Sequence, residues 1–193
     1  MDIFRQARVE INSAERAILL MKNSKTFDKF EEAWKSFLNN IEKCRVKVER
    51  ACQHKRNLFQ PWQGKFITLR KKDPLLRYIK HARNVDQHTI EEIVKHTPGW
   101  SGLRHTGRSG YVKSLKIANN VITEYIGSPL VIENHPSRID LLRVKDSGNW
   151  YNPPTSHLDK NLEQRDPISI AQTGLEFYRQ FLKEAEEKFA ENI

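Results

Sequence analysis

The chain has 193 residues, 38% of them hydrophobic and 30% charged, with a formal net charge of +9. This length suits one domain with a real core, and no stretch approaches the roughly 20 apolar residues that a membrane span needs. The N-terminus "MDIFRQARVE" lacks the features of a signal peptide, and two cysteines are too few for a disulfide framework or a zinc site. We therefore expect a cytoplasmic protein, with nucleic acid favoured as partner by the basic charge.

The first half of the chain carries two helical patterns. Apolar residues at alternating spacings of three and four predict a helix from about Asp2 to Lys22 and a longer one from Phe27 to Ala51. Ser24 or Thr26 is expected to cap the start of the second helix. Cys44 lies on the apolar stripe of that helix, so we interpret it as a small core residue and not as a nucleophile.

The segment 53–72 shows no long period. It contains Pro61 and Gly64, which are frequent in turns and loops. The sequence therefore predicts a connector here, with one short strand at Lys65–Leu69.

A third helix is predicted over 73–94, "DPLLRYIKHARNVDQHTIEEIV". Asp73 suits the cap and Pro74 the first helical position. Two charged residues interrupt the middle of its predicted stripe, which consists of Leu76, Ile79, Arg83, Asp86, Ile90 and Ile93. Charged residues on a core-facing stripe raise the question of a functional site.

The texture changes after Thr97, where Gly, Pro and β-branched residues become frequent. Turns are expected at Asn119–Asn120, His135–Pro136 and Ser147–Gly148, which predicts a small antiparallel sheet. A last helix begins at Asp166–Pro167 and continues the three-four alternation. Its internal glycine, Gly174, is expected to mark a close helix contact.

These elements predict a mainly α fold with a β insertion. We expect an antiparallel four-helix bundle, with a small antiparallel sheet between its third and fourth helices. The predicted organisation is a bundle of three helices over 1–97, a β-rich insertion over 98–160 and a closing helix over 161–193.

The third helix carries Arg83, Asn84 and, after three more residues, His88. This pattern resembles the signature of the HEPN superfamily, small helical bundles with an Arg, four to six residues and a His. The resemblance covers about residues 1–95 and 165–190. It implies a metal-independent endoribonuclease, of the kind found in toxin–antitoxin, phage-defence or RNA-processing systems, that works as a homodimer with the two motifs in one shared site.

The implied roles agree with the chemistry of RNA cleavage. His88 suits a general base for the 2′-hydroxyl, Arg83 a planar partner for the phosphate, and Asn84 a group that orients either. His81, Asp86 and Arg77 on the same helix are expected to bind substrate. Five residues of helix leave Arg83 and His88 about 140° apart, so they do not share a face of one helix. Either Arg83 bends towards a cleft formed by both chains of a dimer, or the motif is structural here. No metal ligands and no cofactor are expected.

Two other functions remain open from the sequence. One is a catalytically silent HEPN-like binding module, such as a phage or mobile-element accessory protein, whose β insertion contacts a protein partner. The other is a purely structural helical domain. In that case, Arg83 and Asp86 form a satisfied polar layer between helices and His88 is an exposed surface residue.

Overall fold

The structure, a computed structural model, describes residues 2–107, 109–119 and 121–190. The chain divides into two compact units. The helical unit comprises Met1–Lys95 and Ile139–Ile193, and the hairpin unit comprises His96–Arg138. Helices dominate and the rest consists of short strand pairs, which confirms the predicted mainly α class with a β component.

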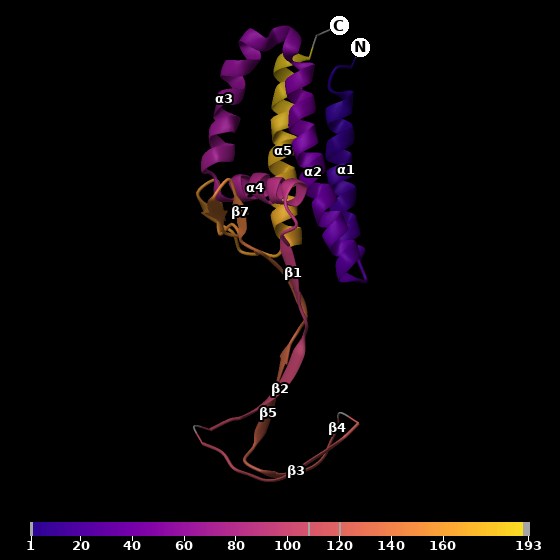
Figure 1. Cartoon of the computed structure of the whole chain (residues 1–193), viewed down its shortest axis with the longest axis vertical. Helices are drawn as coiled ribbons and strands as arrows, with labels where there is room; N and C mark the ends of the chain where they lie inside the picture. Colours follow the sequence, from indigo (N-terminus) through magenta and orange to yellow (C-terminus); the bar gives the residue numbers. More distant parts are fainter. Residues whose placement is uncertain (1, 108, 120, 191–193) are drawn as a thin grey trace. The chain divides into compact units, whose positions relative to one another are not determined.

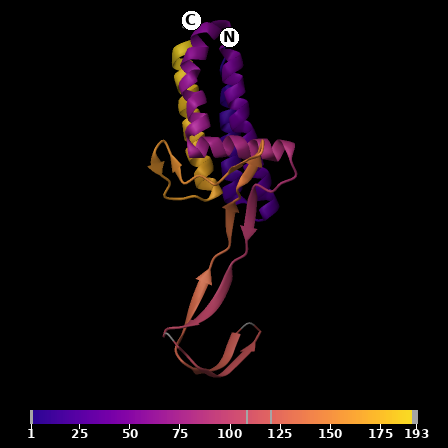
Figure 2. The same ribbon diagram turned by 60° about the vertical axis from the view of Figure 1, so that its left-hand side comes forward.

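The helices all belong to the helical unit. They are α1 (Arg5–Asn23), α2 (Phe27–Ala51), α3 (Arg56–Lys72), α4 (Pro74–His88) and α5 (Pro167–Phe189), with a short 3-10 turn, η1 (Gln53–Lys55), before α3. Figures 1 and 2 show α1, α2 and α5 running side by side, with α4 lying across α2 and α5. Among the described residues, no helix combines the length and the apolarity that crossing a membrane requires.

The two long N-terminal helices follow their predicted stripes. Thr26 caps α2 by accepting a hydrogen bond from the Lys29 backbone N–H, as expected from the sequence. Trp34 and Phe37 stack with ring centroids 5.7 Å apart and are fully buried. Cys44 is also fully buried, and burial raises the pKa of its thiol to about 12, which confirms a core role.

The prediction for residues 53–72 is wrong, because the segment Lys65–Leu69 lies in helix α3 and forms no strand. Phe59, Trp62 and Phe66 recur at spacings of three and four and bury one face of α3 against α5. Trp62 and Phe66 have ring centroids 5.6 and 4.8 Å from that of Phe181. Burial at about 1.5–3 kcal/mol per large side chain outweighs the roughly 3 kcal/mol that Pro61 costs inside a helix.

The predicted end of the third helix at Val94 is also wrong, since α4 ends at His88. Thr89 is extended, with φ −136° and ψ 174°. Its hydroxyl donates to the Val85 carbonyl and accepts from the Glu91 backbone N–H. The predicted stripe therefore breaks: Ile90 is fully exposed, and Ile93 is buried outside the helix. Competition from a β-branched, hydroxyl-bearing residue explains the stop.

The closing helix α5 begins as predicted. Asp166 accepts hydrogen bonds from the backbone N–H groups of Ile168 and Ser169. A Cβ built on Gly174 meets the Ile79 Cδ1 atom at 2.6 Å. The expected close contact at this glycine is confirmed, and it fixes how tightly α4 crosses α5.

Within the described residues, the strands form five two-stranded sheets and not the single sheet expected. The pairs are β1 (Val94–Thr97) with β6 (Arg138–Leu141), β2 (Trp100–His105) with β5 (Leu130–His135), β3 (Val112–Ala118) with β4 (Val121–Gly127), β7 (Val144–Asp146) with β8 (Asn149–Tyr151), and β9 (Ser156–His157) with β10 (Lys160–Asn161). The predicted turn at Ser147–Gly148 joins β7 to β8, with φ of 50° and 82°. Of the turn predicted at Asn119–Asn120, the second residue lies outside the described residues, and Asn119 has φ 50°.

Candidate functional site

Helix α4 is fixed at its start by a buried carboxylate. Asp73 accepts from the Leu76 backbone N–H at 2.9 Å and from the Leu158 backbone N–H at 2.7 Å, and its Oδ1 lies 3.0 Å from Nδ1 of His157. Burial raises the pKa of this carboxyl, but the hydrogen bonds from His157, Leu76 and Leu158 outweigh burial and leave the pKa lowered. The start of α4 is therefore held from two sides.

The polar residues of α4 lie on different faces. Arg77, His81, Asn84 and His88 follow one another at spacings of four, three and four, which places them on one side of the helix. We call this the histidine face. Arg83 belongs to another side and is turned by roughly 120° from the histidine face. Of the six site residues predicted from the sequence, the structure thus groups four.

Arg83 and Asp86 contact α2. The Arg83 guanidinium donates from Nε to Oδ1 of Asn39 at 3.4 Å. The Asp86 carboxylate lies 3.7 Å from Nζ of Lys35. Both side chains are half-buried, so they form a polar contact between α4 and α2 and are not paired with each other.

His81 is the most constrained member of the histidine face. Its Nδ1 lies 2.7 Å from Oδ2 of Asp146 in β7, and its ring stacks on Tyr151 of β8 with centroids 3.6 Å apart. Asn84 donates to the same Asp146 oxygen at 2.9 Å. Residues more than sixty positions apart in sequence therefore form one half-buried polar cluster.

Electrostatics define the proton positions in this cluster. Burial lowers the pKa of His81, and the charges of Lys80 and Arg77 lower it further, against the opposing effect of Asp146. The hydrogen bond from His81, with smaller ones from Asn84 and Ser147, lowers the pKa of Asp146. A neutral imidazole donating from Nδ1 to a carboxylate follows, and its Nε2 carries the lone pair that can accept a proton.

The β7–β8 hairpin reaches α4 through its inner side. Tyr78, buried on α4, donates from its hydroxyl to the Leu142 carbonyl at 2.7 Å, just before β7. The pairs Val144↔Tyr151 and Asp146↔Asn149 alternate with Lys145↔Trp150 along the two strands. Because successive strand residues point to opposite sides, Lys145 and Trp150 lie on the outer side, away from α4.

The outer side of this hairpin combines an aromatic ring with positive charge. Trp150 is 52% exposed. The Arg143 guanidinium lies 4.3 Å from the centroid of its ring, and Nζ of Lys145 lies 5.8 Å from it. An exposed indole flanked by two cations suits stacking with a base next to a phosphate.

Sequence reasoning missed Asp146 and Tyr151. The signal that was available is the hairpin turn Ser147–Gly148, which fixes Asp146 and Asn149 as neighbours across the strands. The turn could be predicted, but its docking on α4 could not, because nothing local states which helix a hairpin contacts. His88 lies where expected on the histidine face and is exposed at the last residue of α4.

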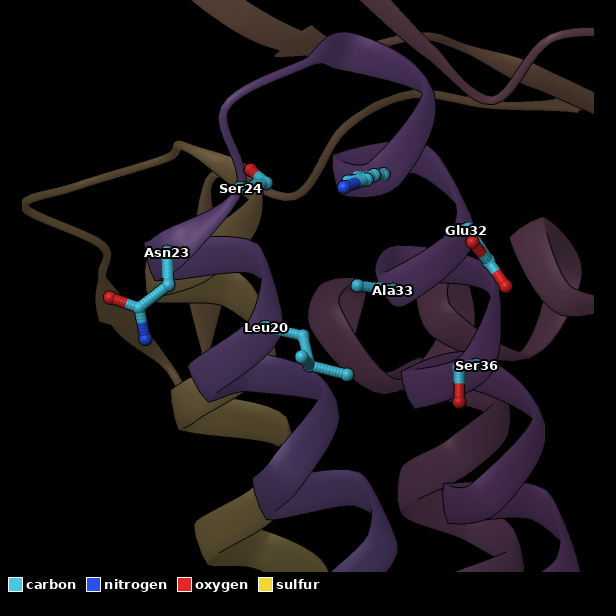
Figure 3. Close-up of a pocket in the computed structure, with 7 residues that line it drawn as sticks. Leu20, Asn23, Ser24, Glu32, Ala33 and Ser36 are labelled. Carbon is cyan, nitrogen blue, oxygen red and sulfur yellow. The ribbon is translucent and has the colours of Figure 1, made fainter.

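The helical unit also has a hollow away from α4. A space of about 460 Å³ lies between the end of α1 and the first half of α2, and Figure 3 shows Leu20 projecting towards the side of α2 that carries Ala33 and Ser36. Its other lining residues are Asn23, Ser24, Lys29 and Glu32. It contains no histidine and no residue of α4, so the histidine face is the better candidate for chemistry.

Within the described residues, no three His, Cys, Asp or Glu side chains gather as a metal site would require. Comparisons of the chain with protein-family models, with curated proteins and with solved structures find no match.

Proposed function

We propose that this protein is an endoribonuclease that cleaves RNA without a metal ion, with its acid–base groups on the histidine face of α4. In this proposal α1, α2, α4 and α5 correspond to the helices of a HEPN-like bundle, and α3 is an addition. The observation that carries the proposal is the His81–Asp146 pair, which lies on the same face of α4 as His88 but about two turns from it. The family resemblance of Arg83, Asn84 and His88 supports it.

The chemistry uses the nucleophile that RNA carries. A neutral His81 accepts the 2′-hydroxyl proton at Nε2, the 2′-oxygen bonds to phosphorus, and the bond from phosphorus to the 5′-oxygen breaks. The leaving oxygen takes a proton from a second group, for which we assign His88. Asp146 holds His81 in the tautomer that this step needs. The products are a 2′,3′-cyclic phosphate and a free 5′-hydroxyl.

A second copy of the chain is part of the proposal. His81 and His88 are seven residues apart, which is about 10 Å along a helix axis and too far for one phosphate. A homodimer solves this if each site combines His81 of one copy with His88 of the other. The site that the HEPN resemblance implies is likewise formed by residues of two chains.

The phosphate also needs a cation. Arg77 lies on the histidine face, with its guanidinium 5.9 Å from the centroid of the Tyr151 ring. Arg83, which the resemblance assigns to this role, contacts Asn39 of α2 instead. We therefore propose Arg77 as the phosphate partner within a chain and Arg83 as a residue that positions α4 on α2.

The test uses single-stranded RNA in the presence of EDTA. His81→Ala and His88→Ala should each lower the cleavage rate by about 10²–10⁴-fold, the usual loss for a general acid or base. His54→Ala, in η1 of the same unit, is the matched control. Mixing the two inactive variants should restore part of the activity, because half of the sites in a mixed dimer are intact. Arg77→Ala should lower the rate more than Arg83→Ala.

Folded wild type that leaves RNA intact with and without EDTA would end the enzyme proposal. So would a His81→Ala protein that cuts as fast as wild type. A thermal melt of each variant separates loss of chemistry from loss of fold, which matters most for Arg83 because its side chain bridges two helices.

A second candidate function is RNA binding without cleavage, and the outer side of the β7–β8 hairpin favours it independently. There Trp150→Ala should weaken binding of single-stranded RNA roughly 10-fold, within the 1–3 kcal/mol that stacking of one base provides. Trp100→Ala, at another exposed tryptophan, is the control. Binding that depends on Trp150, with no cutting by wild type, would select this candidate.

A further inference from the structure

The two sides of the β7–β8 hairpin differ because side chains alternate along its strands. Val144 is buried and Asp146 hydrogen-bonds to α4, so these residues of β7 point towards the helices. Arg143 and Lys145 alternate with them and are exposed. Trp150, which pairs with Lys145 across the strands, lies on the same outer side. The hairpin therefore has one side packed on the helical unit and one side open to solvent.

The two cations of the outer side contact an aromatic ring instead of an acid. Among the described residues, neither the Arg143 guanidinium nor the Lys145 ammonium is paired with a carboxylate, and both lie over the Trp150 ring. Elsewhere, exposed Arg104 and Lys116 each have a glutamate partner. The positive charge on the outer side is therefore available to an anion.

The Trp150 ring also has surface left for a planar ligand. The Arg143 guanidinium lies over it with its central carbon 4.3 Å from the ring centroid, whereas Nζ of Lys145, at 5.8 Å, is beyond contact distance. Trp150 is nevertheless 52% exposed. An acidic peptide would use the charges alone. One nucleotide of a single strand uses both features, with its base on the indole and its phosphate beside the cations.

This outer side lies one residue away from the candidate catalytic side. Trp150 and Tyr151 are consecutive in β8, so their Cα atoms are about 3.8 Å apart and their rings point to opposite sides. Tyr151 stacks on His81 and lies near Arg77. In the part of the chain that the structure describes, β8 pairs only with β7, so its other edge carries no strand. An RNA strand bound at His81 can therefore pass over this edge and reach Trp150.

We propose that the RNA cleaved on the histidine face is unpaired beside the cleaved phosphate, and that the base next to this phosphate stacks on Trp150. Arg143 and Lys145 bind the phosphate that follows. The inference rests on the proposed cleavage and adds a substrate class to it, single-stranded RNA or an unpaired loop in preference to duplex. In a duplex each base is stacked between its neighbours, so no base face is free for the indole.

Binding of a 2′-O-methyl RNA tests the stacking apart from cleavage, because this RNA has no free 2′-hydroxyl to attack the phosphate. Wild type should bind the single strand at least about 10-fold more tightly than the same strand in a duplex, although the duplex has the higher charge density. Trp150→Ala should lose this preference, and Trp150→Phe, which keeps a ring, should retain most of it. Trp100→Ala, at another exposed tryptophan, is the matched control.

The salt dependence of the same binding separates the cations from the ring. Arg143→Gln and Lys145→Gln should each reduce the slope of log affinity against log salt concentration by about 0.7, the value for one phosphate of a single strand. Trp150→Ala removes no charge and should leave the slope unchanged. Lys183→Gln, at an exposed lysine of α5, is the control for charge.

Cleavage of ordinary RNA then tests whether the stacked base is the one beside the cut. An abasic nucleotide next to the bond that wild type cuts should raise KM roughly 10-fold, and Trp150→Ala should do the same with the intact strand. The two changes together should cost no more than either alone, because both remove one contact.

The outcomes separate this inference from the proposed function. Wild type that cuts no RNA refutes the proposed function, and the inference falls with it. Wild type that cuts RNA while Trp150→Ala binds and cuts equally well refutes the inference alone. So do losses from the abasic nucleotide and from Trp150→Ala that simply add.

Discussion

The helical unit and the hairpin unit differ in how much of their apolar side chains they bury. The first buries Trp34, Phe37 and Tyr178 almost completely, while the second leaves Ile117 and Ile132 mostly exposed. A helix satisfies its backbone hydrogen bonds internally and needs only one stripe covered. A two-stranded ribbon has two faces and two free edges, which a segment of this size cannot cover by itself. The helical unit therefore has a core of its own, whereas the described residues of the hairpin unit include none that is buried.

The ion pairs compared in the two units also differ in how deeply they are buried. In the helical unit, buried Asp73 is paired with His157 and buried Glu10 with Lys47. In the hairpin unit, the pair of Arg104 with Glu133 is exposed to solvent. Exposed pairs contribute only about 0–1 kcal/mol, so they do not replace a missing core.

The largest expected difference between the units is in the response to truncation of an apolar side chain. Phe37→Ala removes a fully buried ring and should lower the free energy of unfolding by about 3–5 kcal/mol. Leu115→Ala in the hairpin unit should change the helical unfolding transition by less than about 0.5 kcal/mol. Urea unfolding followed by far-ultraviolet circular dichroism measures both. Similar losses in the two variants would show that the units unfold as one cooperative body.

The sequence predicted the helices whose apolar periodicity is uninterrupted. It failed for α3, which contains a proline and a glycine, residues that usually interrupt helices. The bounds of α2 follow directly from its stripe. In α3, Pro61 and Gly64 suggested a connector, although Phe59, Trp62 and Phe66 already showed helical spacing. A Cβ at Gly64 would meet no atom within 4 Å, so no close contact requires a glycine at this position. Aromatic periodicity was the stronger signal because it reports burial against α5.

The candidate site was predicted on one element and incompletely. Helical spacing alone places Arg77, His81, Asn84 and His88 on one face, and the structure adds Asp146 and Tyr151, which contact that face. Asp146 and Tyr151 could not be predicted, because their contact with α4 depends on how the β7–β8 hairpin docks. Tertiary contacts over sixty residues apart leave no periodic trace in one sequence.

An intermediate effect concerns two glycines that differ in their surroundings. Gly174→Ala should destabilise the protein by about 1 kcal/mol or more, because its Cβ would meet the Cδ1 atom of the buried Ile79 at 2.6 Å and the Ile79 side chain must move within a packed core. Gly64→Ala should stabilise by roughly 0.5–1 kcal/mol, because the position is helical and its Cβ meets nothing within 4 Å. Opposite signs in thermal melts are the expected result. Equal signs would contradict the close crossing of α4 and α5.

The smallest expected effect is a pH dependence of the unfolding free energy. We expect His81 of the helical unit to contribute to it and His135 of the hairpin unit not to. Burial lowers the pKa of His81 in the folded protein. As pH falls through about 6.5, an unfolded chain gains a proton at this residue while the folded chain resists, so stability declines. The lowered pKa of Asp146 adds a second decline, which begins only below about pH 4. Both shifts therefore favour the folded state at neutral pH and lose this effect in acid.

Urea unfolding at pH 7.5 and pH 5.5 isolates the first decline, since Asp146 stays ionised over that range. His81→Gln should reduce the difference in unfolding free energy between the two pH values, because the variant has no proton to gain at this position. His135→Gln is the control from the hairpin unit, where the imidazole is exposed and stacks on Trp100. It should leave the difference unchanged, because unfolding of the helices does not alter its surroundings. If His81→Gln retains the full wild-type difference, the half-buried His81–Asp146 pair does not hold its imidazole neutral, and the assignment of His81 as the proton acceptor is lost with it.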